Sequence, residues 1–261
     1  ETCSGLSRSE LLEIAVNARK NVEKMISEDT KAMFHRLDEE TVVEERYFET
    51  GWGKTHVYVV RSLNHKDEKL PVVVNAHGGG WTLEHSERDL YFCRRMAYLA
   101  GCVVFDIDYV LAPEHPYPAA VDDAQAAWDY LMLQGYGAKD IFVAGDSAGG
   151  NLALALGLRL KKQKRMLPAG FVLMSPWTDL TVSGKTHETK ADVDPVLNQN
   201  YLNEMIENYV PQAKKEQMEA VKPLQAAGTL QEGNTIQAAD TLREANALQE
   251  ENTLQAADTL Q

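Results

Sequence analysis

One serine stands among glycines in the segment Gly145-Asp146-Ser147-Ala148-Gly149-Gly150, where its hydroxyl could serve as a nucleophile. The spacing Gly-x-Ser-x-Gly is typical of a nucleophile elbow, a strained strand-to-helix turn on which side chains in place of the glycines would collide. The apolar run 141–144 before it and the Ala- and Leu-rich run after it predict that strand and that helix. The same pattern also arises by chance in Gly- and Ser-rich turns, so its neighbours must support the interpretation.

A second glycine-rich segment, His77-Gly78-Gly79-Gly80-Trp81, follows the apolar run 71–76. Glycines let backbone N–H groups approach a substrate oxygen, and with an N–H group beside the serine they would form an oxyanion hole. We expect His77 to shape this loop through hydrogen bonding rather than to act as a base. The predicted oxyanion donors are the backbone N–H groups of Gly78, Gly79 and Ala148. Supporting roles are predicted for His77, Gly80, Gly145, Asp146 and Gly149.

Together with the Pro-rich segment 108–118, these two motifs resemble the hormone-sensitive-lipase-like esterases of the α/β-hydrolase superfamily. Three motifs in the family's order are far more specific than any one of them. The resemblance covers about residues 41–209, with the N-terminal helix matching the family's cap. It implies a carboxylic-ester hydrolase that acts through a serine acyl-enzyme on small or short-acyl esters, with no cofactor and no metal.

The catalytic base is the part of this pattern that the sequence lacks. A serine nucleophile normally needs a histidine oriented by Asp or Glu, and in this fold both follow the serine in the chain. After Ser147 the only histidine is His187, which we expect on a solvated loop within 181–190. Asp240 and Asp258 belong to repeats, so neither is assigned as the acid. We therefore predict an esterase impaired by the loss of its acid and histidine. A non-catalytic binding protein and a truncated esterase-gene product stay open as alternatives.

The rest of the chain predicts an α/β fold. Two alternating segments, 41–49 and 55–61, flank Gly51-Trp52-Gly53 and predict an antiparallel hairpin. Further strands are expected over 71–76, 102–107, 141–144 and 171–174, the last one buried, with helices over 86–99, 119–133, 147–162 and 200–209. This alternation predicts a three-layer α/β-hydrolase sheet, mainly parallel, with a helical cap and C-terminally incomplete. Structural pairing is expected for Asp106, Asp108, Glu114 and His115.

The N-terminal segment predicts a helix that starts at a capping box formed by Ser7 and Glu10 and runs to about Glu28. It lies either over the catalytic face, as part of a cap, or against the edge of the sheet. Hydrophobic periodicity alone leaves both placements open.

Hexapeptide tandem repeats follow Pro223, with leucine or isoleucine at every sixth position from Leu224 to Leu260. On an α-helix a step of six turns the side chain by about 240°, so these residues would form no apolar seam. A hexapeptide β-helix of about two turns is too short to bury a core, so we favour a disordered or partly ordered tail. The predicted divisions are cap helices 1–40, α/β-hydrolase core 41–177, cap-like helical region 178–223 and repeat tail 224–261.

Composition limits the partners. A net charge of −13 argues against nucleic acid or an anionic membrane, and no apolar run is long enough to span a membrane. The three cysteines lack metal-ligand spacing, and Cys102, in an apolar run, is expected in the core. So few cysteines favour a reducing compartment and a cytoplasmic location, although a removed signal peptide would leave the same sequence. A small-molecule ester is the expected partner, and the oligomeric state stays open.

Overall fold

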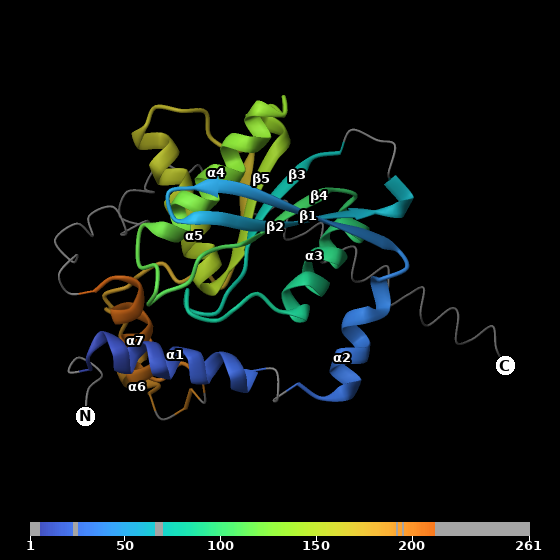
Figure 1. Ribbon diagram of the computed structural model, residues 1–261. Coiled ribbons are helices and arrows are strands. Elements are labelled where there is room, and N and C mark those ends of the chain that lie inside the picture. Colours follow the sequence, from blue (N-terminus) through green and yellow to red (C-terminus); the bar gives the residue numbers. More distant parts are fainter. Residues whose placement is uncertain (1–5, 23–25, 66–69, 192, 195, 212–261) are drawn as a thin grey trace. The chain divides into compact units, whose positions relative to one another are not determined.

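The structure, a computed structural model, describes residues 6–22, 26–65, 70–191, 193–194 and 196–211 (Figure 1). Its strands form one sheet, in the order β1 (Thr41–Thr50), β2 (Gly53–Ser62), β4 (Val103–Asp108), β3 (Val72–Ala76), β5 (Ile141–Asp146) and β6 (Gly170–Met174). The pairs β1–β2 and β2–β4 are antiparallel, and the remaining pairs are parallel. The sheet is therefore mixed and mainly parallel, as the sequence predicts. Its antiparallel pairs lie at the end that carries β1 and β2.

Helices cover both faces of this sheet. The main ones are α3 (Glu87–Ala100), α4 (Ala119–Leu133) and α5 (Ser147–Lys162). Successive residues of β2 point to opposite sides: Val59 belongs to the cluster that holds Trp128 and Leu152, whereas Val60 packs with Cys93. Because Trp128 and Leu152 lie on α4 and α5 and Cys93 lies on α3, the fold has three layers.

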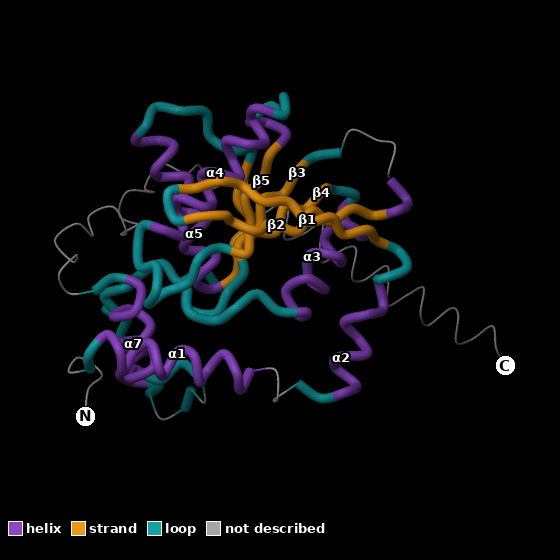
Figure 2. Tube along the Cα trace, viewed as in Figure 1, coloured by secondary structure: helices purple, strands orange, loops and turns teal. Residues whose placement is uncertain are grey.

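Shorter elements complete the described chain. They are α1 (Arg8–Val22), α2 (Glu28–Phe34), α6 (Thr186–Thr189) and α7 (Gln199–Tyr209), with 3-10 turns at His35–Leu37, Leu63–His65 and Ala138–Asp140. Figure 2 shows loop segments between the sheet and the helices α1 and α7. The loop after β3 carries the glycine-rich motif 77–81, whereas the motif that contains Ser147 lies at the junction of β5 and α5.

Local signals in the sequence place most boundaries correctly. The hairpin closes where Thr50 pairs with Gly53, the last residue of the predicted turn. Ser86 and Asp89 form a capping box at the start of α3, and Gly101, in the left-handed conformation, ends that helix. Cys102 is buried, as expected.

Two predictions about elements are wrong. The first helix ends at Val22 rather than near Glu28, and the Ser27 hydroxyl instead accepts the N–H of Thr30 and starts α2. The strand β6 is half-buried rather than buried, because it lies at an edge of the described sheet and has a strand neighbour on one side only. Composition of a strand does not reveal whether it is central or at an edge.

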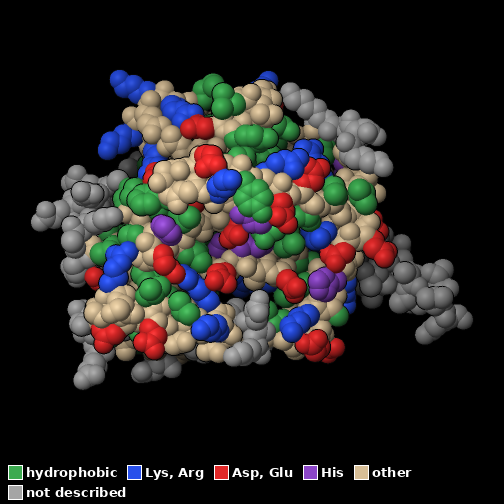
Figure 3. Space-filling view, in the orientation of Figure 1, with side chains coloured by type: hydrophobic (Ala, Val, Ile, Leu, Met, Phe, Trp, Pro, Cys, Tyr) green, Lys and Arg blue, Asp and Glu red, His purple; other side chains and the backbone are tan. Residues whose placement is uncertain are grey.

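The repeats and the tail division 224–261 lie outside the described residues, as does the end of the division 178–223. No helix in the part of the chain that the structure describes is long and apolar enough to cross a membrane. Figure 3 shows acidic and basic side chains scattered together over the viewed face rather than gathered into one basic area.

Candidate active site

The predicted nucleophile stands at the junction of β5 and α5. Ser147 has φ +50°, in the left-handed region that few residues other than glycine adopt, so its backbone is strained as an elbow requires. A Cβ at Gly145 would collide with the backbone of Gly149, and one at Gly149 would overlap the carbonyl oxygen of Ala76. The tight approach of α5 to the ends of β3 and β5 therefore requires both glycines.

Ser147 is partly exposed and lies on the wall of a cavity of about 550 Å³. The same wall carries Gly79 and Gly80 of the glycine-rich loop. Ala148 is buried in the first turn of α5, where backbone N–H groups have no partner within the helix. The structure thus brings the serine, at the N-terminus of α5, and part of the predicted oxyanion loop to one cavity.

The three glycines of the loop do not face this cavity equally. Gly79 and Gly80, with φ +104° and +62°, line it, whereas Gly78 does not. The Asp146 carboxylate lies against Gly78, where an added Cβ would overlap it. The role of Gly78 as an oxyanion donor stays a prediction.

His77 is buried behind the loop. Its Nδ1 lies 2.8 Å from the carbonyl oxygen of Gly78, its ring stacks on Tyr109 with centroids 4.3 Å apart, and the Tyr109 hydroxyl donates to the His77 carbonyl oxygen at 2.8 Å. Burial lowers the pKa of His77, which keeps the ring neutral. The side chain therefore holds the loop and lies away from the Ser147 cavity.

A second cavity, of about 250 Å³, lies beneath the loop and is lined in part by His77, Asn75, Asp89 and Asp146. Burial raises the pKa of Asp146, and the nearby Asp89 carboxylate adds to this effect. The Asp146 carboxylate lies against Gly78, and Asp146 lines both cavities, so its supporting role stays a prediction.

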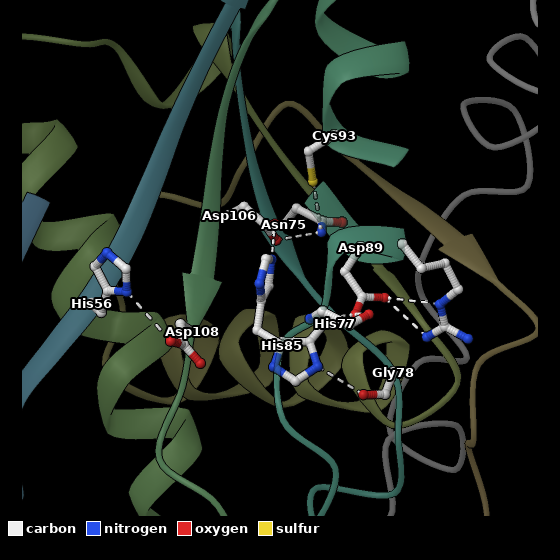
Figure 4. Close-up of polar contacts among 11 residues, drawn as sticks. His56, Asn75, His77, Gly78, His85, Asp89, Cys93, Asp106 and Asp108 are labelled. Carbon is white, nitrogen blue, oxygen red and sulfur yellow. Dashed lines mark hydrogen bonds and ion pairs between the residues drawn. The ribbon is translucent and has the colours of Figure 1, made fainter. Parts of the chain in front are cut away.

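Behind the loop the sheet carries a buried polar cluster that the sequence analysis did not identify (Figure 4). Nε2 of His85 lies 2.6 Å from one carboxylate oxygen of Asp106, and the Asn75 amide donates to the other at 2.8 Å. The same amide lies 3.4 Å from the Cys93 sulfur. Asn75 and Asp106 interrupt otherwise apolar strands, and that interruption is the sequence signal that could have revealed the cluster.

The remaining acids pair within the scaffold. Asp108 of β4 contacts the His56 ring at 3.3 Å, which Figure 4 shows beside the buried cluster. Glu114 receives two hydrogen bonds from Arg19, at 2.6 and 3.0 Å. Burial works to raise the pKa of Glu114, but the hydrogen bonds and charge of Arg19 outweigh it and leave the pKa below its usual value.

The helix α1 lies against the loops that follow β3 and β4. Arg19 donates to the carbonyl oxygens of Thr82 at 2.7 Å and of Ala112 at 3.0 Å, besides its bonds to Glu114. Arg8 donates to the carbonyl oxygen of Pro113. These contacts place α1 at the loops beyond the strand ends rather than at the edge of the sheet.

His187 is the residue that the sequence placed least well. We expected it on a solvated loop, but it is half-buried in α6 and lies on the wall of the cavity that contains Ser147. Its position depends on contacts of the preceding loop rather than on a local pattern. Within the described residues, no group of three or more His, Cys, Asp or Glu side chains could hold a metal ion.

Comparisons with known proteins agree with this geometry. The sequence profile of the alpha/beta hydrolase fold family matches residues 73–256, beginning after the hairpin and running past the end of the expected resemblance at residue 209. An esterase of Acinetobacter venetianus is 38% identical over 139 residues, which are 53% of this chain and 46% of that protein. Mouse hormone-sensitive lipase is 32% identical over 142 residues, which are 53% of this chain and 19% of that protein.

The chain thus spans half or less of the length of these curated relatives. Among solved structures, an esterase from the bacterial hormone-sensitive lipase family superposes with a TM-score of 0.65 at 27% identity, covering 83% of this chain and 74% of that one. The match of the family profile to most of the chain, together with an elbow and a glycine-rich loop at the expected strand ends, means that this chain belongs to the alpha/beta hydrolase fold family and is hormone-sensitive-lipase-like.

Proposed function

We propose that this chain hydrolyses small carboxylic esters through an acyl-enzyme on Ser147. The observation that carries the proposal is the strained Ser147 on the wall of a cavity of about 550 Å³, beside Gly79 and Gly80. Relatives described as esterases support the same reaction class. Both halves of an acyl-transfer site, a nucleophile and backbone donors, then face one space.

The proposed oxyanion donors are the N–H groups of Gly78, Gly79 and Ala148. Support for them comes from Gly79, which lines the cavity beside Ser147 on the loop that directly follows β3. Ala148 contributes an N–H group at the positive end of the α5 dipole. Each such donor is worth roughly 10²–10³ in kcat when it is aimed at the developing oxyanion.

In the proposed reaction, Ser147 Oγ attacks the ester carbonyl carbon, and the carbonyl electrons move to the oxygen held by the backbone donors. The intermediate collapses and expels the alcohol, leaving an acyl group on Ser147. Water then attacks that acyl group and releases the acid. The chain carries the nucleophile and oxyanion donors on rigid elements, β5 with α5 and the loop after β3.

Turnover of p-nitrophenyl acetate and butyrate by the full chain tests the proposal. Replacement Ser147→Ala is expected to lower kcat/KM by at least about 10³-fold. Ser9→Ala, at an exposed position on α1, is the matched control and should leave the rate unchanged. Equal rates for the wild type and Ser147→Ala would rule out a serine mechanism.

A second candidate function is non-catalytic binding of an ester-like ligand. The observation in its favour is that, in the described part of the chain, no side chain hydrogen bonds to the Ser147 hydroxyl. A binding protein would retain p-nitrophenyl butyrate without hydrolysing it and would resist labelling by a fluorophosphonate. Labelling of Ser147 within minutes, located by peptide mass spectrometry, favours the hydrolase.

The division of the chain follows from the same proposal. We infer that 41–177 forms the hydrolase core and that 1–40 and 178–223 form a cap beside the cavity. Support comes from Arg19, which bonds to the loops after β3 and β4, and from Leu202 and Met205 of α7, which line the cavity. The buried free thiols of Cys93 and Cys102 support a reducing compartment such as the cytoplasm.

A further inference from the structure

A further cavity, of about 370 Å³, lies between the β1–β2 hairpin and the end of α4. Among the described residues it shares no wall residue with the Ser147 cavity. Near the end of β2, Val60 pairs with Val104 at the start of β4, so this cavity lies toward the amino ends of the parallel strands, whereas Ser147 follows the carboxyl end of β5. Its volume falls in the range of small-molecule sites, which is roughly 300–1,000 Å³.

One part of the wall of this cavity is apolar and aromatic. Val59 and Phe105, which are paired on β2 and β4, both line it and are both buried. The Tyr130 ring beside them packs on Phe48 with centroids 4.6 Å apart, and it lies 6.2 Å from Phe105. Because these contacts fix the Tyr130 ring, the cavity offers a preformed surface for an aromatic ring or a short alkyl chain.

The hairpin side of the cavity carries two guanidinium groups, of Arg46 and Arg61, and one carboxylate, of Glu44. Arg46 is paired with Glu44, which balances the charge of both. Arg61 lies opposite Val42 in the register of the hairpin, so it has no acidic neighbour directly across from it. Its guanidinium makes no hydrogen bond and no ion pair within the described part of the chain. The wall therefore carries one positive charge in excess, and that charge is unpaired.

The helix side of the cavity is formed by the last turn of α4 and the turn that follows it. The last carbonyl oxygens of the helix accept N–H groups from that turn: Tyr130, Leu131 and Met132 from Gln134, Tyr136 and Gly135, at 2.9, 3.2 and 3.1 Å. Since these acceptors are already used, they do not compete for the Arg61 guanidinium. The C-terminal end of a helix dipole disfavours an anion, so an anionic group is held on the hairpin side.

We propose that this cavity binds a small organic carboxylate that carries an aromatic ring or a short alkyl chain. The planar guanidinium of Arg61 donates two parallel N–H···O bonds to the carboxylate, the geometry that best matches these two groups. The apolar body of the ligand lies along Val59, Phe105 and Tyr130. One excess positive charge matches a monoanion rather than a phosphate dianion. The proposal does not depend on ester hydrolysis at Ser147.

Benzoate is the probe for the test, because it joins one carboxylate to one aromatic ring. Calorimetric titration of the full chain with benzoate compares the wild type with Arg61→Gln and with Arg36→Gln, which removes an exposed arginine outside the cavity. Arg61→Gln should weaken binding by at least about 10-fold, the effect of losing one charge-assisted hydrogen bond, while Arg36→Gln leaves it unchanged. Equal affinity of the wild type and Arg61→Gln, or no binding of millimolar benzoate to the wild type, overturns the proposal.

A second pair of variants and a measurement of position complete the test. Gln134→Glu adds a carboxylate to the wall and should weaken benzoate binding by at least about 10-fold, whereas Gln163→Glu makes the same change of charge at an exposed position outside the cavity and should not. Hydrogen exchange of residues 57–61 and 130–136 should slow when benzoate binds. Slower exchange confined to segments that line the Ser147 cavity overturns the assignment. Tighter binding of inorganic phosphate than of benzoate overturns the choice of a carboxylate.

Discussion

The rings of Trp81 and Tyr209 lie parallel, with centroids 4.1 Å apart and planes 1° apart. Trp81 follows the last glycine of the oxyanion loop, and Tyr209 is the last residue of α7, so the stack joins that loop to a helix far along the chain. Both residues are buried, and Trp177 packs against the same Trp81 ring at 5.1 Å. Met205 of the same helix lies against Gly80, where a Cβ would come within 2.6 Å of its sulfur. The helix α7 therefore supports the loop that we assign to oxyanion binding.

Truncation of the stack should destabilise the protein. Tyr209→Ala is expected to cost about 3–5 kcal/mol in the free energy of unfolding, as for other buried aromatic residues cut to alanine. Tyr209→Phe is the matched control, because the Tyr209 hydroxyl is buried without a hydrogen-bond partner among the described residues. Its removal should be neutral or stabilising. Denaturant unfolding measures both, and equal destabilisation by the two variants would contradict the role of the ring.

Most of the fold could be predicted because its signals are local. The alternation of residues 41–49 and 55–61 around Gly51-Trp52-Gly53 sets a hairpin, and Ser86 and Gly101 mark the two ends of α3. The end of α1 could not be predicted in this way, because the apolar spacing continues past Val22. The decisive signal is Ser27, whose hydroxyl caps the start of a separate helix, α2.

The site was harder to predict because its geometry depends on distant contacts. Sequence order names the glycines of the oxyanion loop, but only the folded chain shows that Gly79 and Gly80 line the Ser147 cavity and that Gly78 lies against Asp146. His187 belongs to no motif, and Asp179 and Trp177 bring it to the cavity through contacts with the elbow. Contacts of this kind leave no local pattern in the sequence, whereas the elbow is recognisable from its Gly-x-Ser-x-Gly spacing.

Substitution at Gly149 should damage the elbow. Its Cβ would overlap the Ala76 carbonyl oxygen, so Gly149→Ala forces α5 away from β3 and should cost about 3 kcal/mol or more. Gly51→Ala, in the hairpin turn, is the matched control because no atom lies within 4 Å of its added Cβ. Thermal melts of the two variants give the comparison. A melting temperature for Gly149→Ala as high as that of Gly51→Ala would show that the elbow tolerates a side chain.

Removal of Arg19 should loosen α1 from the loops it contacts. The guanidinium donates to Thr82, Ala112 and Glu114, and a lysine could not reproduce this fork. We expect faster hydrogen exchange in the amides of α1 for both Arg19→Ala and Arg19→Lys, with exchange in α5 unchanged. Lys20→Ala, at an exposed position of the same helix, is the control. If α1 exchanges at the same rate in all three variants and in the wild type, other contacts hold the helix.

The pair of His85 and Asp106 should make stability depend on pH. Burial works to lower the pKa of His85, but the hydrogen bond and charge of Asp106 outweigh it, so the pKa in the folded protein is raised above its usual value. A raised histidine pKa means that the folded state binds the proton more tightly than the unfolded chain does. The stabilisation is therefore fully present below pH about 6.5, the unfolded pKa, and is lost as pH rises through the folded pKa.

Replacement His85→Gln isolates this contribution. The difference in unfolding free energy between the wild type and His85→Gln should be larger at pH 6 than at pH 9, as measured by denaturant unfolding at each pH. The depressed pKa of His77, caused by burial, has the opposite sign, since its contribution is lost as pH falls. The wild type and the His85→Gln variant both contain His77. Its contribution therefore cancels in the difference between their unfolding free energies, apart from any effect of His85 on His77. A difference that stays constant from pH 6 to pH 9 would mean that His85 binds no extra proton on folding, and that its contact with Asp106, at 2.6 Å, is made by a neutral ring.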